Sequence, residues 1–284
     1  MLLRFTKMHG LGNDFVVLDQ ISQDTKLRGD QVRALANRHL GIGFDQLLTV
    51  EPPSDTRADF LYRIFNANGE EVEQCGNGAR CLILFVRDRG LTSKDSIVLE
   101  TKGGYLYCQV EEDGKICVNM GAPKLKPQDI PFLNDSTEIT YDLFIPKGIH
   151  QGQKPNHVTV SAINIGNPHV VVLVEDISTA PVNELGPFLE CHKSFPKNTN
   201  VNFMKIISRD EVALRVYERG VGETLACGTG ACAAVVAGRL QKRLDSKVKV
   251  HLPGGTLLIR WSGGRSDIHM TGPACRVYEG RIEI

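Results

Sequence analysis

The sequence has no excess charge and no long hydrophobic run, and both absences restrict the partners that it can have. Lysine and arginine together number 33, and so do aspartate and glutamate. No overall field therefore attracts nucleic acid or an anionic membrane surface. An apolar run such as Leu82 to Val86 is far shorter than the roughly 20 residues of a membrane-spanning helix. We expect no nucleic acid and no membrane as partner, and a small molecule instead.

The sequence also lacks the marks of a secreted, disulfide-bonded protein. The first ten residues, MLLRFTKMHG, contain no apolar core of a signal peptide. Eight cysteines in such a chain are expected to be free thiols, because the cytosol keeps thiols reduced. These features predict a cytoplasmic protein.

A cysteine in a glycine-rich turn occurs twice, in two similar segments. Residues 62–81 read YRIFNANGEEVEQCGNGARC and residues 214–233 read LRVYERGVGETLACGTGACA. Aligned without a gap, they place Cys75 on Cys227, 152 residues later. The same alignment places Gly76 on Gly228, Gly78 on Gly230, Glu71 on Glu223 and Arg63 on Arg215. Since 284 residues suffice for two hydrophobic cores, the repeat predicts two homologous halves that each carry one thiol.

The elements around these turns are predicted in the same order in both halves. Residues 5–19 and 160–176 both read as strand, loop and strand, with Gly12-Asn13 matched by Gly166-Asn167. After the first cysteine, residues 79–89 are apolar around nearly the whole of their first two turns, which indicates a helix buried on all sides. An alanine-rich helix is its counterpart after the second cysteine.

Residues 30–40 predict a further helix, with Asp30 as N-cap and an end at Gly41. Prolines at positions 123, 127 and 131 mark the crossing between the halves. We therefore expect domains at 1–127 and 128–273, with residues 274–284 returning to the first sheet.

The cysteine turns have the features of a site for acid–base chemistry. A thiol reacts as thiolate, and a helix N-terminus favours the negative charge and lowers the pKa. The glycines that follow allow backbone amides to form a nest for a carboxylate or phosphate. If the halves close face to face, one thiolate removes a proton from a carbon while the other thiol donates to the opposite face. This pattern predicts stereoinversion next to a carboxylate, with no cofactor required.

Other interpretations of the same residues are weaker. Cys75 with Cys81, and Cys227 with Cys232, suggest a four-thiolate zinc site, but the second member of each pair points from a helix core. The segment GTGACA resembles a dinucleotide-binding turn, but the loop GVGETLA separates it from the preceding strand. We expect no metal site. Among the histidines, His169 lies in the loop that matches Gly12-Asn13, where it would tune a neighbouring thiol.

With these motifs in view, the sequence strongly resembles the diaminopimelate epimerase family. The blocks MHGLGNDF, FNANGEEVEQCGNGARC, IGNPH, NTNVNF, YERGVGETLACGTGACA and PGG lie in the family order over essentially the whole chain. The resemblance implies interconversion of LL- and meso-diaminopimelate without pyridoxal phosphate, in lysine and peptidoglycan biosynthesis. It also implies an α+β fold of two pseudo-symmetric halves, each a curved, mostly antiparallel sheet around a central apolar helix, and a homodimer.

The resemblance also implies roles for individual residues. Cys75 and Cys227 would be the acid–base pair, assisted by Glu218 and His169. The residues implied to bind substrate, with Glu218 again among them, are Asn13, Gln46, Asn66, Gly76, Asn77, Asn167, Asn200, Glu218, Arg219, Gly228 and Thr229. Of these, the amides of Gly76-Asn77 and Gly228-Thr229 would hold the reacting carboxylate.

Two rival functions stay open at this point. Proline or hydroxyproline racemases and phenazine-type isomerases share the implied fold, but the former carry different motifs around the thiols and the latter lack the thiol pair. A non-catalytic zinc or redox module built on the same cysteines is the rival of another class.

Overall fold

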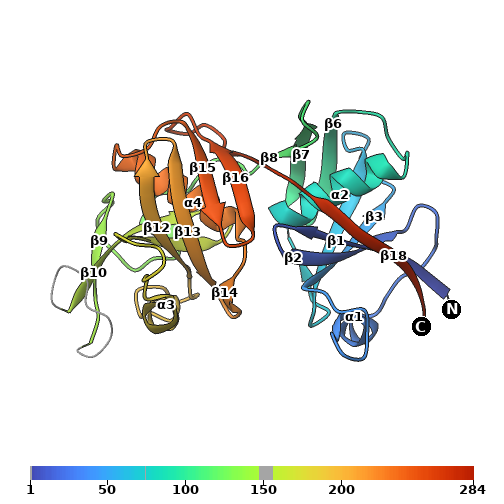
Figure 1. The fold of residues 1–284 in the computed structure, drawn as a ribbon, viewed down its shortest axis with the longest axis horizontal. Coiled ribbons are helices and arrows are strands. Elements are labelled where there is room, and N and C mark those ends of the chain that lie inside the picture. Colours follow the sequence, from blue (N-terminus) through green and yellow to red (C-terminus); the bar gives the residue numbers. More distant parts are fainter. Residues whose placement is uncertain (1, 74, 147–155) are drawn as a thin grey trace. The chain divides into compact units, whose positions relative to one another are not determined.

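A computed structural model describes residues 2–73, 75–146 and 156–284 and has an α+β fold with few helices (Figure 1). The chain divides into two compact units. The first unit comprises Met1–Asn119 and Thr271–Ile284, and the second comprises Met120–Met270. The sequence placed the boundaries at 127/128 and 273/274. Residues 120–126 belong to the second unit because Met120 and Lys124 form backbone hydrogen bonds with Ile268 and Asn164.

Over its described residues, the first unit contains two helices, and its strands pair side by side in a sheet. Its elements are β1 (Leu2–Gly10), β2 (Asn13–Asp19), α1 (Gly29–Ala36), β3 (Gln46–Glu51), β4 (Phe60–Asn66), β5 (Glu71–Val72), α2 (Gly76–Asp88), β6 (Ser96–Thr101), β7 (Gly104–Val110), β8 (Ile116–Asn119) and β18 (Cys275–Glu283). Neighbouring strands are mostly antiparallel, but β2 runs parallel to β3 and β4 runs parallel to β6. The C-terminal strand β18, dark red in Figure 1, pairs antiparallel with β1, in dark blue.

The second unit repeats this arrangement. Its elements are η1 (Pro127–Asp129), β9 (Tyr141–Phe144), β10 (His157–Asn164), β11 (Pro168–Leu173), α3 (Val182–Glu190), β12 (Asn200–Ser208), β13 (Glu211–Glu218), β14 (Gly222–Thr224), α4 (Gly228–Leu240), β15 (Lys247–Leu252), β16 (Gly255–Arg260) and β17 (His269–Gly272). The chain passes back to the first unit within β17, after Met270. The parallel pairs β11–β12 and β13–β15 correspond to β2–β3 and β4–β6. Strand β9 pairs with β10 as β18 pairs with β1.

A buried helix lies at the centre of each sheet. Helix α2 packs against β1, β2, β3, β4, β7, β8 and β18, and α4 packs against β10, β11, β12, β13 and β16. Both helices are buried along most of their length, as the apolar sequences predict. Alanine and glycine make up much of α4, so backbone and strands approach closely around it.

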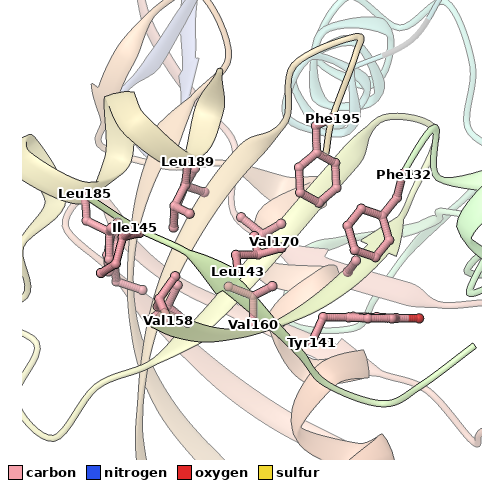
Figure 2. Close-up of a cluster of buried hydrophobic side chains, with 14 of the residues drawn as sticks. Phe132, Tyr141, Leu143, Ile145, Val158, Val160, Val170, Leu185, Leu189 and Phe195 are labelled. Atoms are coloured by element: carbon pink, nitrogen blue, oxygen red, sulfur yellow. The ribbon is translucent and has the colours of Figure 1, made fainter. Parts of the chain in front are cut away.

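The second unit has a further core between its sheet and α3. Phe132 stacks on Phe195 with ring centroids 4.7 Å apart, and Tyr141 meets Phe132 edge-on at 4.7 Å. Figure 2 shows these rings with Val170 and Leu189 among the buried side chains. This core anchors β11 and β12, and both strands carry predicted site residues at their N-terminal ends.

Several local predictions were wrong. Arg28, not Asp30, is the N-cap of the helix predicted over 30–40. The helix predicted over 30–40 ends at Ala36, because Asn37 is extended and its side chain accepts hydrogen bonds from the amides of His39 and Leu40. Leu40, within the predicted helix, is 89% exposed. Asn13, placed in the loop with Gly12 from the sequence, begins β2, because Leu11 and Gly12, both at positive φ, form a tight two-residue turn.

Candidate active site

Both cysteines of the duplicated turn are N-cap residues of central helices. Cys75 precedes α2 and Cys227 precedes α4, each in an extended conformation. Since the first amides of a helix have no partner in its own ladder, the turns that begin at Gly76 and Gly228 present N–H groups beside each thiol. The predicted placement of both thiols at helix N-termini is confirmed.

In the first unit, polar side chains surround Cys75. The amide of Gly78 lies 3.4 Å from Cys75 Sγ, and Asn13 Oδ1 lies 4.0 Å from it. Asn77 Nδ2 donates to the same Asn13 oxygen at 3.3 Å. Tyr62, which is fully buried, donates its hydroxyl to the carbonyl of Cys75 at 3.2 Å. Strand β4, which carries Tyr62, thus holds the N-cap Cys75 in place.

A charged cluster fixes the position of Asn13. Its Nδ2 donates to Asp45 at 2.9 Å, and Arg38 binds both Asp45 and Asp14. Lys7 also pairs with Asp14. Although burial alone raises the pKa of Asp14, the hydrogen bonds from Arg38 and Lys7 hold that pKa well below its usual range. Asp14 therefore stays ionised, and its contacts with Arg38 and Lys7 hold the start of β2.

Two further predicted residues of the first unit are paired at the adjacent strand ends. Gln46 begins β3 and Asn66 ends β4, and their side chains hydrogen bond at 2.9 Å. Because Gln46 is opposite Phe15 in the parallel pair β2–β3, it lies one strand away from Asn13. All predicted site residues of the first unit thus lie at one end of its sheet, around the start of α2.

In the second unit, an acid lies beside the thiol. Glu218 ends β13 and accepts a hydrogen bond from Thr224 at 2.5 Å. Burial raises the pKa of Cys227 well above its ordinary value, and the negative charge of Glu218 raises it further. Thr229, whose Oγ1 is 3.5 Å from the sulfur, and the Gly230 amide act in the opposite direction but do not outweigh burial. The helix N-terminus does lower this thiol's pKa, through the Gly230 amide, but the net direction is upward because burial outweighs it, so Cys227 keeps its proton at neutral pH.

The remaining predicted residues of the second unit form a hydrogen-bonded group at the start of β11 and β12. His169 Nε2 lies 2.9 Å from Asn167 Oδ1. Asn200 donates to the carbonyl of Pro168 at 2.9 Å and accepts from the amide of Arg219 at 3.0 Å. These contacts connect the loop before β11 to the end of β13, next to Glu218.

Several residues that hold these groups were not predicted. They are Tyr62, Asp45, Thr224 and Asn202. Asn202 is fully buried and donates to both His169 and the carbonyl of Val170. Tyr62 and Asn202 lie on strands as ordinary alternating positions, so only their contacts distinguish them. A polar residue on an otherwise apolar buried strand, as in NVNFM at 200–204, is the signal that would have indicated Asn202.

Two further cysteines lie inside the central helices. Cys81 is buried within α2, where burial raises its thiol pKa strongly, and Cys232 is buried within α4. In the described part of the chain, no three His, Cys, Asp or Glu side chains gather as a metal site would require. None of the helices over the described ranges has the length and apolar character needed to cross a membrane.

Comparison with known proteins identifies the family of the chain. The family model described as Diaminopimelate epimerase matches residues 5–126 and 161–277. Proteins named diaminopimelate epimerase from Thioalkalivibrio sulfidiphilus and Ectopseudomonas mendocina are 54% and 52% identical, and each alignment covers all of both chains. A phenazine biosynthesis protein of the PhzF family from Bacillus anthracis has a TM-score of 0.71, with full coverage of both chains, but only 19% identity. That likeness shows the fold alone, whereas the sequence matches show that the chain belongs to the diaminopimelate epimerase family.

Proposed function

We propose that this chain is an isomerase that converts LL-diaminopimelate to meso-diaminopimelate without pyridoxal phosphate. The observation that carries the proposal is a match to the family over the full chain together with one cysteine at a helix N-terminus in each unit. The duplicated thiols supply the two proton-transfer groups that inversion of a carbon centre needs.

In the proposed reaction, one thiolate takes the α-proton of the substrate and the other thiol gives its proton to the opposite face of the same carbon. The negative charge that develops passes to the adjacent carboxylate, where hydrogen-bond donors stabilise it. One proton leaves and one arrives, so the product differs only in configuration and the two cysteines exchange protonation states.

The surroundings of Cys227 support a role as proton donor. Its raised pKa, due to burial and then to Glu218, keeps the proton on sulfur at neutral pH. Cys75 would then act as the base in that direction of the reaction, with the roles exchanged in the reverse direction. The first-turn amides at Gly76-Asn77 and Gly228-Thr229 would bind the carboxylate next to the reacting carbon.

Polar residues at the sheet ends would recognise the far end of the substrate. We assign this role to Asn13, Gln46, Asn66, Asn167, Asn200, Glu218 and Arg219. A guanidinium such as that of Arg219 matches a carboxylate in shape and charge, and amide and carboxylate oxygens accept from an ammonium group. His169 would support the site by orienting Asn167, to which it is hydrogen bonded.

The direct test is epimerisation in deuterated water without added cofactor. Incubation with LL-diaminopimelate should give meso product with one deuterium on the inverted α-carbon, because the donating thiol exchanges with solvent. Unlabelled product, or a need for pyridoxal phosphate, would contradict the two-base scheme.

Matched variants test whether each thiol is needed for catalysis. Cys75→Ala and Cys227→Ala should each abolish turnover, whereas Cys191→Ala, at an exposed site after α3, should leave it unchanged. Full activity in either of the first two variants would show that the cysteine in question serves only in packing.

We further infer a cytoplasmic homodimer that acts in lysine and peptidoglycan biosynthesis. The inference rests on membership of the family, since lysine biosynthesis and the cell wall are the uses of meso-diaminopimelate that the resemblance implies. Light scattering of the purified protein should give twice the 31.3 kDa chain mass. A monomer at all concentrations tested would refute the dimer and leave the chemistry untouched.

A further inference from the structure

A buried histidine and asparagine of the second unit form a pair beneath the first turn of α4. His169 lies on β11 and Asn202 on β12, and both are fully buried. Asn202 Nδ2 is 3.2 Å from His169 Nδ1 and 2.8 Å from the carbonyl oxygen of Val170. Asn202 Oδ1 faces Gly230, where an added Cβ would approach it to 2.4 Å. Since Gly230 is three residues after Cys227, the pair supports the second cysteine turn.

These contacts determine which ring nitrogen of His169 carries the hydrogen. A carbonyl oxygen only accepts, so the Asn202 group that faces Val170 is the NH2 group, and the amide orientation is fixed. The same NH2 group faces His169 Nδ1, which is therefore an acceptor. The hydrogen of the neutral ring is then on Nε2, which lies 2.9 Å from Asn167 Oδ1. His169 therefore donates to Asn167.

The neutral state of the ring has a clear physical cause. Burial, helped by the positive charge of Arg219, lowers the pKa of His169 to about 3. At neutral pH the ring therefore donates one hydrogen bond through Nε2 and accepts one at Nδ1, and it forms a hydrogen-bond relay from Asn202 to Asn167.

The relay sets the direction of the Asn167 amide. Because Oδ1 of Asn167 accepts from His169, its NH2 group points to the other side of this half-buried residue. Two N–H donors are then offered to a ligand, and they match an acceptor such as a carboxylate oxygen. An inverted amide would present an oxygen there and repel a carboxylate.

The first unit shows that the fold does not need this polar pair. In β2–β3, Phe15 is opposite Gln46, as His169 is opposite Asn200 in β11–β12. Two residues further along β3 is Leu48, the counterpart of Asn202.

Leu48 and Asn202 also have the same neighbour in the two units. Leu48 lies against Gly78 as Asn202 lies against Gly230, and the repeat aligns these two glycines. Phe15 and Leu48 are fully buried and apolar. Burying a histidine and an asparagine in the same places costs stability unless they are hydrogen bonded. The polar pair therefore serves something other than packing.

We propose that Asn202 is a positioning residue that acts through His169 to direct the Asn167 amide donors toward a carboxylate of the substrate. The identity of the ligand rests on the proposed function, whereas the hydrogen-bond relay does not. The tautomer of His169 is therefore the decisive observable, because it can be measured without substrate and without activity.

The experiment is NMR of the full chain with 15N-labelled histidine, with the His169 signals assigned by their loss in His169→Gln. Wild-type protein at pH 7 should show one neutral form with the hydrogen on Nε2. Asn202→Leu, which installs the residue found in the first unit, should populate the Nδ1–H form. Asn202→Asp, which has nearly the same shape, should place a hydrogen on Nδ1 because a carboxylate only accepts.

The NMR results test the proposal without any measurement of enzyme activity. A wild-type Nδ1–H ring, or an imidazolium at pH 7, would overturn the proposal, and so would an unchanged Nε2–H form in either variant. If circular dichroism shows that Asn202→Leu does not fold, the His169 tautomers of wild type and Asn202→Asp are sufficient to test the proposal. A protein with the expected tautomers but no epimerase activity would contradict the proposed function and leave the relay intact.

A kinetic cycle then tests the link to Asn167. Asn202→Leu and Asn167→Ala should each raise KM about tenfold, the loss of roughly one ligand hydrogen bond, with a smaller change in kcat. The double variant should be no worse than Asn167→Ala alone, since both changes remove the same contact. Independent, multiplying effects on KM would show that Asn202 does not act through Asn167.

Discussion

Glu218 lies beside Cys227 at the end of β13 and adds its negative charge to a site where burial already disfavours the thiolate. The pair explains how a cysteine at a helix N-terminus, where amides favour the anion, still keeps its proton.

The first prediction concerns this pair. Glu218→Gln should lower the pKa of Cys227, because the like charge disappears while the shape of the side chain is kept. In a Cys75→Ala background, the rate of alkylation by iodoacetamide should rise at lower pH than with Glu218 present. An identical pH profile in both proteins would show that burial alone sets the pKa. Epimerase activity of Glu218→Gln, measured with Cys75 intact, should fall.

The second prediction concerns the support of the first cysteine turn. An added Cβ at Gly78 would lie 2.3 Å from the Tyr62 hydroxyl, so Gly78→Ala should cost about 1 to 3 kcal/mol in unfolding free energy. Tyr62→Phe should cost about 1 kcal/mol, through loss of the hydrogen bond to the Cys75 carbonyl. The double variant should cost less than the two together, because removal of the hydroxyl makes room for the methyl group. Strict additivity in urea unfolding would refute the clash.

The third prediction concerns acid stability. The folded pKa of His169 is about 3 and its ordinary value is 6.5, so the unfolded chain binds one more proton between these values. Stability from this group is fully present above pH 6.5 and falls by about 1.4 kcal/mol per pH unit below it. His169→Gln should show a shallower fall in unfolding free energy between pH 6.5 and 4 than wild type. Parallel curves would contradict a neutral buried ring.

The fourth prediction compares two ion pairs that the repeat aligns. Arg63 binds Glu71 and Arg215 binds Glu223, in each case through two nitrogens. All four side chains are about a quarter to a third exposed, so water and salt screen both pairs and each contributes less than about 1 kcal/mol.

The two arginines differ in their other contacts. Arg215 also donates to the carbonyl of Ile177, whereas Arg63 lies near Glu51 and over the ring of Phe65. Arg215→Gln should therefore destabilise the chain more than Arg63→Gln, in thermal unfolding at matched salt. The reverse order would show that the extra carbonyl contact is worth little.

Much of the fold follows from the sequence because the signals are local. Alternating apolar strands, glycine turns and the all-apolar helix after each cysteine are written in consecutive residues, and the repeat copies them. The helix predicted over 30–40 failed for a local reason as well, since Asn37 offers the backbone a competing hydrogen bond. Helix α3 went unpredicted, and it contains Pro187, which argues against a helix in any sequence window.

The sequence by itself determined the duplication, the two thiols at helix N-termini and membership of the family. Each of these depends on residue identity and order along the chain. The protonation of Cys227, the tautomer of His169 and the support given by Tyr62 and Asn202 were decided only by the tertiary structure. They depend on burial and on atoms that the sheet brings within about 3 Å from distant positions, and the free energy of a charge or hydrogen bond is set by those surroundings.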